Sequence, residues 1–154
     1  MEPRATRPRF PRGYGIKSDP EGMLPWSRAV ELLTASRNYW ICTAREDGSP
    51  HAMPVWGVCV DGDLYFGTSP ESRKGRNLAH DPRLVVHTES GDEAVVLEGT
   101  VEVLERLPDE AAAAYEAKYD WKPGTEGLWY VVRPRVGFAF LEGDFTGTAT
   151  RYAF

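Results

Sequence analysis

The chain has 154 residues, of which 42% are hydrophobic and 27% are charged, and its formal net charge is −5. This length and composition are typical of one globular domain, which excludes a largely disordered chain and leaves no room for a second sizeable core. The acidic balance argues against duplex nucleic acid as the main partner, because binding to phosphates needs a continuous basic face.

Residues 1–22 differ from the rest of the chain in composition. Prolines and glycines alternate with arginines, and Met1–Lys17 carries a net charge of +4, which leaves −9 for the remainder. Such a segment buries little apolar surface, so we expect a flexible, solvated basic arm, with an anion-binding arm as the alternative. Residues 23–154 are predicted to form the folded domain.

The two cysteines and the N-terminus indicate a cytoplasmic protein. Cys42 and Cys59 lie in apolar runs and lack the spacing of a redox or metal motif, so we expect buried, reduced thiols. The first residues contain no apolar signal core, and the hydrophobic runs are too short to span a bilayer, so no membrane partner is expected.

A helix and the first strand of a hairpin are predicted after the arm. Pro25 suits the first position of a helix, and one apolar face follows at helical spacing. This face consists of Trp26, Ala29, Val30 and Leu33. Residues 38–44 are rich in aromatic and β-branched side chains, which favour a strand, and Glu46–Ser49 forms a turn.

The second strand of this hairpin, residues 50–60, contains two residues that interrupt regular pairing. Pro54 and Gly57 favour a bend or bulge, where the backbone leaves the ladder. Backbone groups left unpaired there can bind the edge of a planar ligand, although a plain barrel corner needs the same residues. Asp61-Gly62 then predicts a tight turn onto a strand over residues 64–68.

A second helix is predicted directly after this strand. Ser69 suits its N-cap and Pro70 follows, so the helix should run to about Ala79, before Asp81-Pro82 ends it.

The start of this helix is strongly basic. Arg73 and Lys74 stand beside the free N–H groups and the positive dipole end of the helix, and Ser72 adds a hydroxyl. Phosphate is the ligand that this corner best suits, because arginine grips it bidentately and lysine supplies a compact charge. An exposed basic helix is the alternative interpretation.

The remaining pattern is mainly β. A helix is predicted over residues 108–119, where alanines follow two acidic residues. Strands are predicted over residues 84–88, 94–104, 128–133, 136–141 and 148–152, with a bulge or close packing at Gly99 and a break at Pro134. About six short strands with hairpin turns and few helices predict a small β-barrel with helices over its openings.

Metal and nucleophile motifs are not found in the sequence. His51, His80 and His87 have no second ligand at zinc-site spacing, and no serine or cysteine stands in an activating motif. We therefore predict no metal site and no catalytic triad.

Two runs in the middle of the chain resemble a known superfamily. These are S-P-H-A-M-P-V-W-G-V (Ser49–Val58) and Y-F-G-T-S-P-E-S-R-K-G-R-N-L (Tyr65–Leu78). Together with the L-E-G strand (Leu97–Gly99) and the ending T-A-T-R-Y-A-F (Thr148–Phe154), they resemble the pyridoxamine 5′-phosphate oxidase-like flavin and deazaflavin oxidoreductases. The resemblance extends from about Trp26 to the C-terminus.

This resemblance implies a six-stranded antiparallel split β-barrel that forms a homodimer, with the cofactor in a groove between the subunits. The strand with Met53, Pro54, Val55 and Trp56 would line the flavin ring, largely through its backbone. The cofactor phosphate would be held by Thr68, Ser72, Arg73 and Lys74. Trp129 and Arg151 are the candidates for residues that the other subunit contributes.

The resemblance also implies a redox enzyme, although not a true pyridoxamine phosphate oxidase, because the ending lacks the extra segment that helps to bind pyridoxal phosphate. The residues of the two runs are most similar to those of the actinobacterial branch that uses the deazaflavin coenzyme F-420. The expected activity is hydride transfer from reduced deazaflavin to a small unsaturated or electron-poor substrate. An FMN-dependent enzyme and a non-catalytic flavin carrier are the alternatives.

Overall fold

Eight antiparallel strands form one sheet in the computed structural model, which describes residues 2–154. The strands are β1 (Arg4–Thr6), β2 (Asn38–Ala44), β3 (Pro50–Val60), β4 (Asp63–Thr68), β5 (Arg83–Thr88), β6 (Glu93–Leu104), β7 (Leu128–Leu141) and β8 (Thr150–Ala153). The α-helices are α1 (Trp26–Ala35), α2 (Arg73–His80), α3 (Asp109–Tyr119) and α4 (Phe145–Thr148), with 3-10 turns at Arg12–Tyr14 and Glu142–Asp144. No helix among these is long and apolar enough to cross a membrane.

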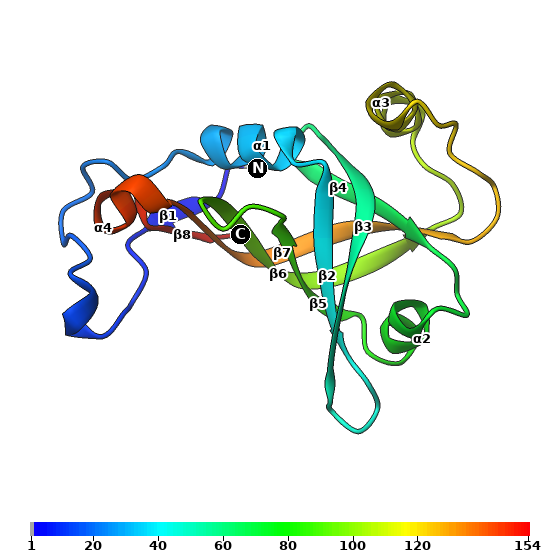
Figure 1. The fold of residues 1–154 in the computed structure, drawn as a ribbon, viewed down its shortest axis with the longest axis horizontal. Helices are drawn as coiled ribbons and strands as arrows, with labels where there is room; N and C mark the ends of the chain where they lie inside the picture. The colour runs from blue at the N-terminus through cyan, green and yellow to red at the C-terminus, as the bar shows by residue number, and fades with distance from the viewer. Residues whose placement is uncertain (1) are drawn as a thin grey trace.

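Six of the strands close into a barrel. The order is β7-β4-β3-β2-β5-β6, and β6 pairs again with β7 to complete the ring. β8 and then β1 extend the sheet at the far half of β7, on the side of the molecule opposite α2 and α3 (Figure 1). The predicted mainly β fold, a six-stranded antiparallel barrel with a few helices, is therefore confirmed.

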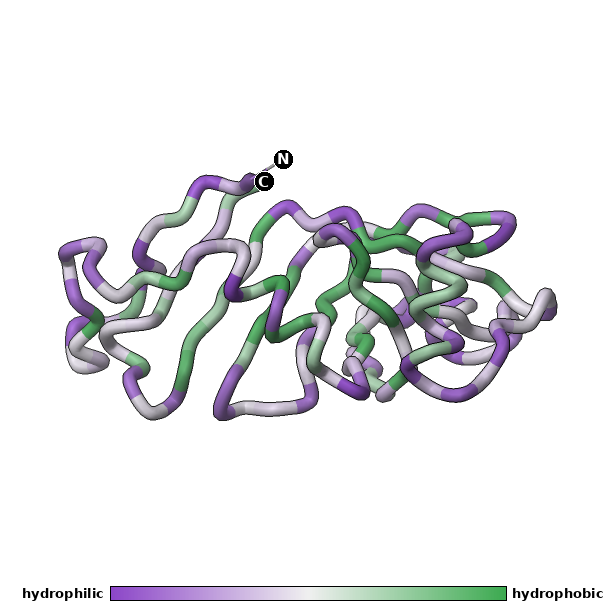
Figure 2. The backbone as a smooth tube through the Cα atoms, turned by 90° about the horizontal axis from the view of Figure 1, so that it is seen from above, coloured by the Kyte–Doolittle hydropathy of each residue, from purple (hydrophilic) through white to green (hydrophobic). Residues whose placement is uncertain are grey.

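The barrel interior is one hydrophobic core. Alternate residues of β2, such as Tyr39 and Ile41, point inward and meet Phe66 from β4 and Val86 from β5. Each such side chain contributes about 1.5–3 kcal/mol when it is fully buried. Figure 2 shows the apolar stretches along the strands and the polar stretches mainly in the connecting loops, as this core requires.

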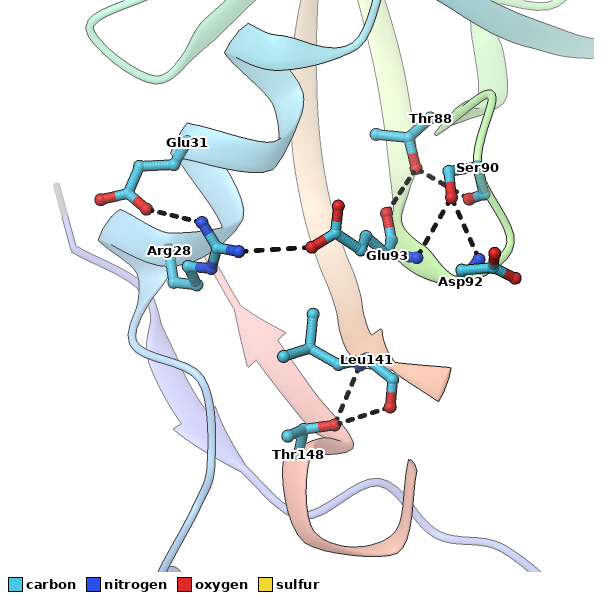
Figure 3. Close-up of polar contacts among 8 residues, drawn as sticks. All are labelled: Arg28, Glu31, Thr88, Ser90, Asp92, Glu93, Leu141 and Thr148. Carbon is cyan, nitrogen blue, oxygen red and sulfur yellow. Dashed lines mark hydrogen bonds and ion pairs between the residues drawn. The ribbon is translucent and has the colours of Figure 1, made fainter. Parts of the chain in front are cut away.

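Helix α1 packs on the barrel and is tied to the turn between β5 and β6. Ala29 and Leu33 are fully buried against the core, as the predicted apolar face requires. On the other face, Arg28 donates hydrogen bonds to Glu31 at 2.9 Å and to Glu93 at 3.4 Å (Figure 3). The helix begins after Pro25, which is its N-cap rather than its first residue.

Strand β7 runs without a break through Pro134, so the prediction of two separate strands was wrong. Gly99 of β6 pairs with Pro134, while Glu98 pairs with Val136, so Arg135 is the extra residue of a bulge. Prolines are found within sheets at bulges, because the irregular ladder there does not require an N–H donor at every position. The bulge predicted at Gly99 is confirmed.

The C-terminal segment also differs from its prediction. Thr148 ends α4 and β8 begins at Thr150, so the last strand starts later than expected. The Thr148 hydroxyl accepts from the Leu141 N–H at 2.9 Å, which folds α4 back onto the end of β7 (Figure 3). It also donates to the Asp144 carbonyl oxygen at 2.6 Å.

The solvated arm expected over residues 1–22 differs from the structure at its start. Arg4–Thr6 pairs with β8 as β1, and the Arg7 guanidinium donates to the carbonyl oxygens of Asp19, Glu21, Gly147 and Ala149 at 2.7–3.0 Å. These bonds join distant parts of the chain, and composition alone does not reveal them.

Helix α3 holds β3 at Gly57. The Tyr119 hydroxyl accepts a hydrogen bond from the Gly57 N–H at 2.9 Å and lies 2.7 Å from the Gly57 carbonyl oxygen. The Lys118 ammonium donates to the Gly57 carbonyl oxygen at 3.0 Å and to the Tyr39 hydroxyl at 2.8 Å, and it also bonds the Ser36 carbonyl. Burial lowers the pKa of Lys118 to about 8.

The bulge gives a first prediction, because a Cβ at Gly99 would lie 2.1 Å from the Arg133 carbonyl oxygen. We expect Gly99→Ala to lower the free energy of unfolding by about 1–3 kcal/mol, measured by urea denaturation. Gly91→Ala is the control, because a Cβ there meets nothing within 4 Å, and its effect should stay within about 0.5 kcal/mol. Equal effects of the two substitutions would contradict this reading of the bulge.

The lowered pKa of Lys118 gives a pH prediction. The pKa of Lys118 in the folded chain lies below its value in the unfolded chain, so the unfolded chain binds more protons between about pH 8 and pH 10. The contribution of Lys118 to the free energy of unfolding therefore increases as the pH rises through this range. The free energy of unfolding of the wild type relative to Lys118→Met should therefore rise from about pH 7 to about pH 9. Lys122→Met, at an exposed loop position, should show no such rise. A difference that does not change with pH would rule out the buried ammonium.

Candidate functional site

One edge of β3 is open where the hairpin of β2 and β3 extends past the barrel (Figure 1). β3 pairs with β2 along residues 50–56, but it pairs with β4 only from Gly57 to Val60. Among residues 2–154, no strand pairs with the other edge of residues 51–56. The N–H and C=O groups that point to this edge are available to a ligand, as the bend predicted at Pro54 and Gly57 suggested.

The far side of this opening is the end of β4. Extending the pairing of Gly57 with Phe66 by two residues places Thr68 opposite Val55, yet the two strands have separated there, and β4 stays paired only with β7 on its other edge. The split between β3 and β4 therefore lies between residues 54–56 on one side and Thr68 on the other.

The predicted ring-lining residues of β3 lie along this open edge. Met53 is 50% exposed and Trp56 is 38% exposed, Pro54 is also exposed, and Val55 is half-buried against the core. The Trp56 ring stacks on Tyr119 with their centroids 4.5 Å apart, so one face of the indole is already covered.

A polar turn connects Thr68 to the basic helix α2. The Ser72 hydroxyl accepts from the Gly75 N–H at 3.1 Å and lies 2.9 Å from the Thr68 hydroxyl. Ser72, not Ser69, is thus the N-cap, and the predicted helix start was three residues too early. Ser69–Ser72 instead forms a turn packed so closely on α2 that a Cβ at Gly75 would lie 2.3 Å from the Ser69 carbonyl oxygen.

The cations of α2 lie beside this turn. Lys74 is half-buried and burial lowers its pKa, whereas Arg73 is exposed. Arg73 and Arg76 also line a hollow of about 420 Å³ with Arg45, Glu46, Asp47 and Asn77, between α2 and the tip of the β2–β3 hairpin. No ion pair formed by residues 2–154 involves Arg73 or Lys74, so neither charge is neutralised by a carboxylate of the described chain.

His51 belongs to this site, although the sequence reasoning considered it only as a metal ligand. Its Nδ1 is the one buried side-chain polar atom of residues 2–154 without a hydrogen-bond partner. Burial, and then the positive charges of Arg45, Lys74 and Arg73, lower its pKa. The hairpin register was a usable signal, since it pairs His51 with Thr43, whose hydroxyl accepts from the Asn77 amide at 3.0 Å.

Trp129 and Arg151, the residues predicted to come from another subunit, have different places within the chain itself. Trp129 is only 9% exposed and packs on Gly67, where a Cβ would lie 2.9 Å from its ring, so it supports the end of β4. Arg151 is on β8, at the opposite end of the molecule from α2 (Figure 1). It can join this site only from a second copy of the chain.

The arrangement suits a flat molecule that carries a phosphate. One side offers an edge of backbone donors and acceptors, and the other offers two hydroxyls, two cations and a helix start. Within residues 2–154, no three His, Cys, Asp or Glu side chains gather into a group that could hold a metal ion.

Comparison with solved structures finds the same fold. A conserved hypothetical protein from Mycobacterium tuberculosis is 21% identical with a TM-score of 0.69, covering 82% of this chain and 90% of its own. A FAD-binding protein from Mesorhizobium loti is 23% identical with a TM-score of 0.61, and the match covers 85% of this chain and 96% of that protein. An F-420 reductase is 25% identical with a TM-score of 0.54, and the match covers 70% of this chain and 93% of that protein. No curated protein matches the chain.

The family model described as pyridoxamine 5′-phosphate oxidase matches residues 26–150. This range contains the barrel, the open edge of β3 and the basic start of α2. The chain belongs to the pyridoxamine 5′-phosphate oxidase family, in its superfamily of split barrels.

Proposed function

We propose that this protein is an oxidoreductase that binds a flavin-type cofactor between the open edge of β3 and the basic start of α2. The observation that carries the proposal is the split itself, because Thr68 stands opposite Val55 with no strand pairing between them. A planar ring fits against a free strand edge, and a phosphate fits the hydroxyls and cations next to it. Solved structures with this fold include proteins described as an F-420 reductase and as FAD-binding, which supports the same class of cofactor.

Each group of the site has a role in this proposal. Thr68 and Ser72 donate hydroxyl hydrogen bonds to the phosphate, and Arg73 and Lys74 balance its charge. Met53, Pro54, Val55 and Trp56 lie along the ring, with the backbone of this stretch pairing with its polar edge. His51 adds one unpaired nitrogen close to Lys74.

The proposed reaction is hydride transfer to a small unsaturated or electron-poor substrate. The bound cofactor supplies the hydride chemistry, and the deazaflavin coenzyme F-420 is our first choice, with FMN as the alternative. The chain itself binds, orients and shields the ring, which is why an oxidoreductase needs no catalytic triad here.

We also propose that two copies associate over the β2–β3 hairpin. Trp40 is 36% exposed on this hairpin, and its register partner Pro54, on the same face, is also exposed. A second copy would cover them and would close the open side of the cofactor site, which one barrel leaves exposed to water.

The cofactor assignment is tested by removing the two cations. Arg73→Ala combined with Lys74→Ala should weaken the binding of coenzyme F-420 and of FMN by about tenfold or more, measured by fluorescence titration, since each charge-assisted bond contributes about 1.5–3 kcal/mol. Arg106→Ala with Lys122→Ala removes the same charges at exposed positions elsewhere and should leave both affinities unchanged. Oxidation of the reduced cofactor by quinones or enones then distinguishes an enzyme from a carrier. Unchanged affinity in the first variant would refute the phosphate site.

The dimer is tested by sedimentation. The wild type should sediment as a dimer, and Trp40→Glu should shift it towards the monomer, because a carboxylate in an apolar interface loses its hydration. Val103→Glu is the matched control, since Val103 is 57% exposed and lies on β6. A monomeric wild type, or the same shift in both variants, would contradict the proposed interface.

A further inference from the structure

The N-terminal segment and β8 lie at the end of the molecule opposite α2 (Figure 1). A second concave surface lies between this segment and the sheet. We call it the N-terminal groove. Its basic half is a hollow of about 600 Å³ lined by Arg4, Thr6, Arg7, Arg9, Phe138 and Arg151. Its apolar half is a hollow of about 240 Å³ lined mainly by Pro8, Phe10, Val96, Phe138, Phe140 and Phe145.

The two halves adjoin on one face of the sheet. Val96 pairs with Phe138, Phe138 pairs with Arg151, and Arg151 pairs with Thr6. Register partners in neighbouring strands point to the same face, so this row runs directly from apolar to basic, with Phe138 in both hollows.

None of the four arginines forms an ion pair within residues 2–154, and only Arg7 has its donors taken up by backbone carbonyl oxygens. Like charges gathered in one hollow repel each other, and a bound anion offsets this repulsion. Each guanidinium can also donate two parallel hydrogen bonds to the anion.

The groove is held in shape before any ligand binds. Arg7 is the exception among the arginines, because its donors bind the Gly147 carbonyl at 2.7 Å and the Ala149 carbonyl at 3.0 Å, which anchors the N-terminal wall to the end of α4. The Phe10 and Phe145 rings meet edge to face with centroids 5.6 Å apart. A preformed wall spares the ligand the cost of ordering it.

We propose that the N-terminal groove binds an amphiphilic anion, an apolar tail that ends in an oxyanion. Arg4, Arg9 and Arg151 hold the oxyanion, and the hollow under Phe10 takes the tail. The sign of the charge follows from the arginines, and the apolar tail follows from the phenylalanines beside them. Within one chain, this groove lies at the end opposite the proposed cofactor site, and the contribution of Arg4 and Arg9 does not depend on that site.

Isothermal titration of the full chain with decanoate, decyl phosphate and decanol tests the proposal. Both anions should bind more tightly than decanol, which has the same chain without the charge, and the tighter anion identifies the head group. Within the carboxylate series, each added methylene should raise the affinity up to about fourfold until the hollow is filled. Anions that bind no better than decanol would overturn the proposal.

Two variants separate the halves of the groove. Arg4→Gln with Arg9→Gln should lower the affinity for decanoate by about tenfold or more and leave the affinity for decanol unchanged. Phe10→Ser should lower the affinity for both ligands. Arg106→Gln, at an exposed position on the segment before α3, is the control and should change neither. Thermal melts check that each variant is folded. If the arginine variants alter sedimentation and leave decanoate binding unchanged, the groove is an interface between copies and the proposal fails.

Discussion

The site depends on where β3 separates from β4, and the hydrogen bonds from α3 to Gly57 fix that point. The last pair of the ladder is Gly57 with Phe66, and a Cβ at Gly57 would lie 2.8 Å from the Tyr65 carbonyl oxygen. Lys118 and Tyr119 bind both backbone polar groups of Gly57, so the strand is anchored on the α3 side. Beyond this residue, β3 stays paired with β2, which pairs in turn with β5 along Tyr39–Cys42, but the other edge of β3 is free.

The same helix explains why the neighbouring strand stays in place. Trp129 of β7 packs on Gly67 and meets Tyr115 of α3 edge to face at 5.4 Å. This small second core fixes the end of β4, from which Thr68 and the turn to α2 continue. The two sides of the split are thus set by one helix, whereas the barrel core alone would leave the hairpin without lateral support.

Local signals in the sequence predicted much of this fold. The alternation in β2, the turn at Asp61-Gly62 and the bulge at Gly99 depend on nearby residues, and the structure contains all three. Predictions failed where distant contacts decide. The N-cap of α2 moved to Ser72 because Gly75 packs on the Ser69 carbonyl, β1 forms because β8 is there to pair with it, and His51 enters the site through packing of α2 on the hairpin.

The pairing of β1 with β8 has a consequence for how the chain acquires its structure during synthesis. Arg4 pairs with Ala153, so the first strand waits for residues near the end of the chain before it has a partner. While the ribosome is still at work, the barrel strands can already pair, but the N-terminal segment and the apolar surface beneath Phe10 stay uncovered. Docking of this segment therefore follows the synthesis of β8 and comes late in folding.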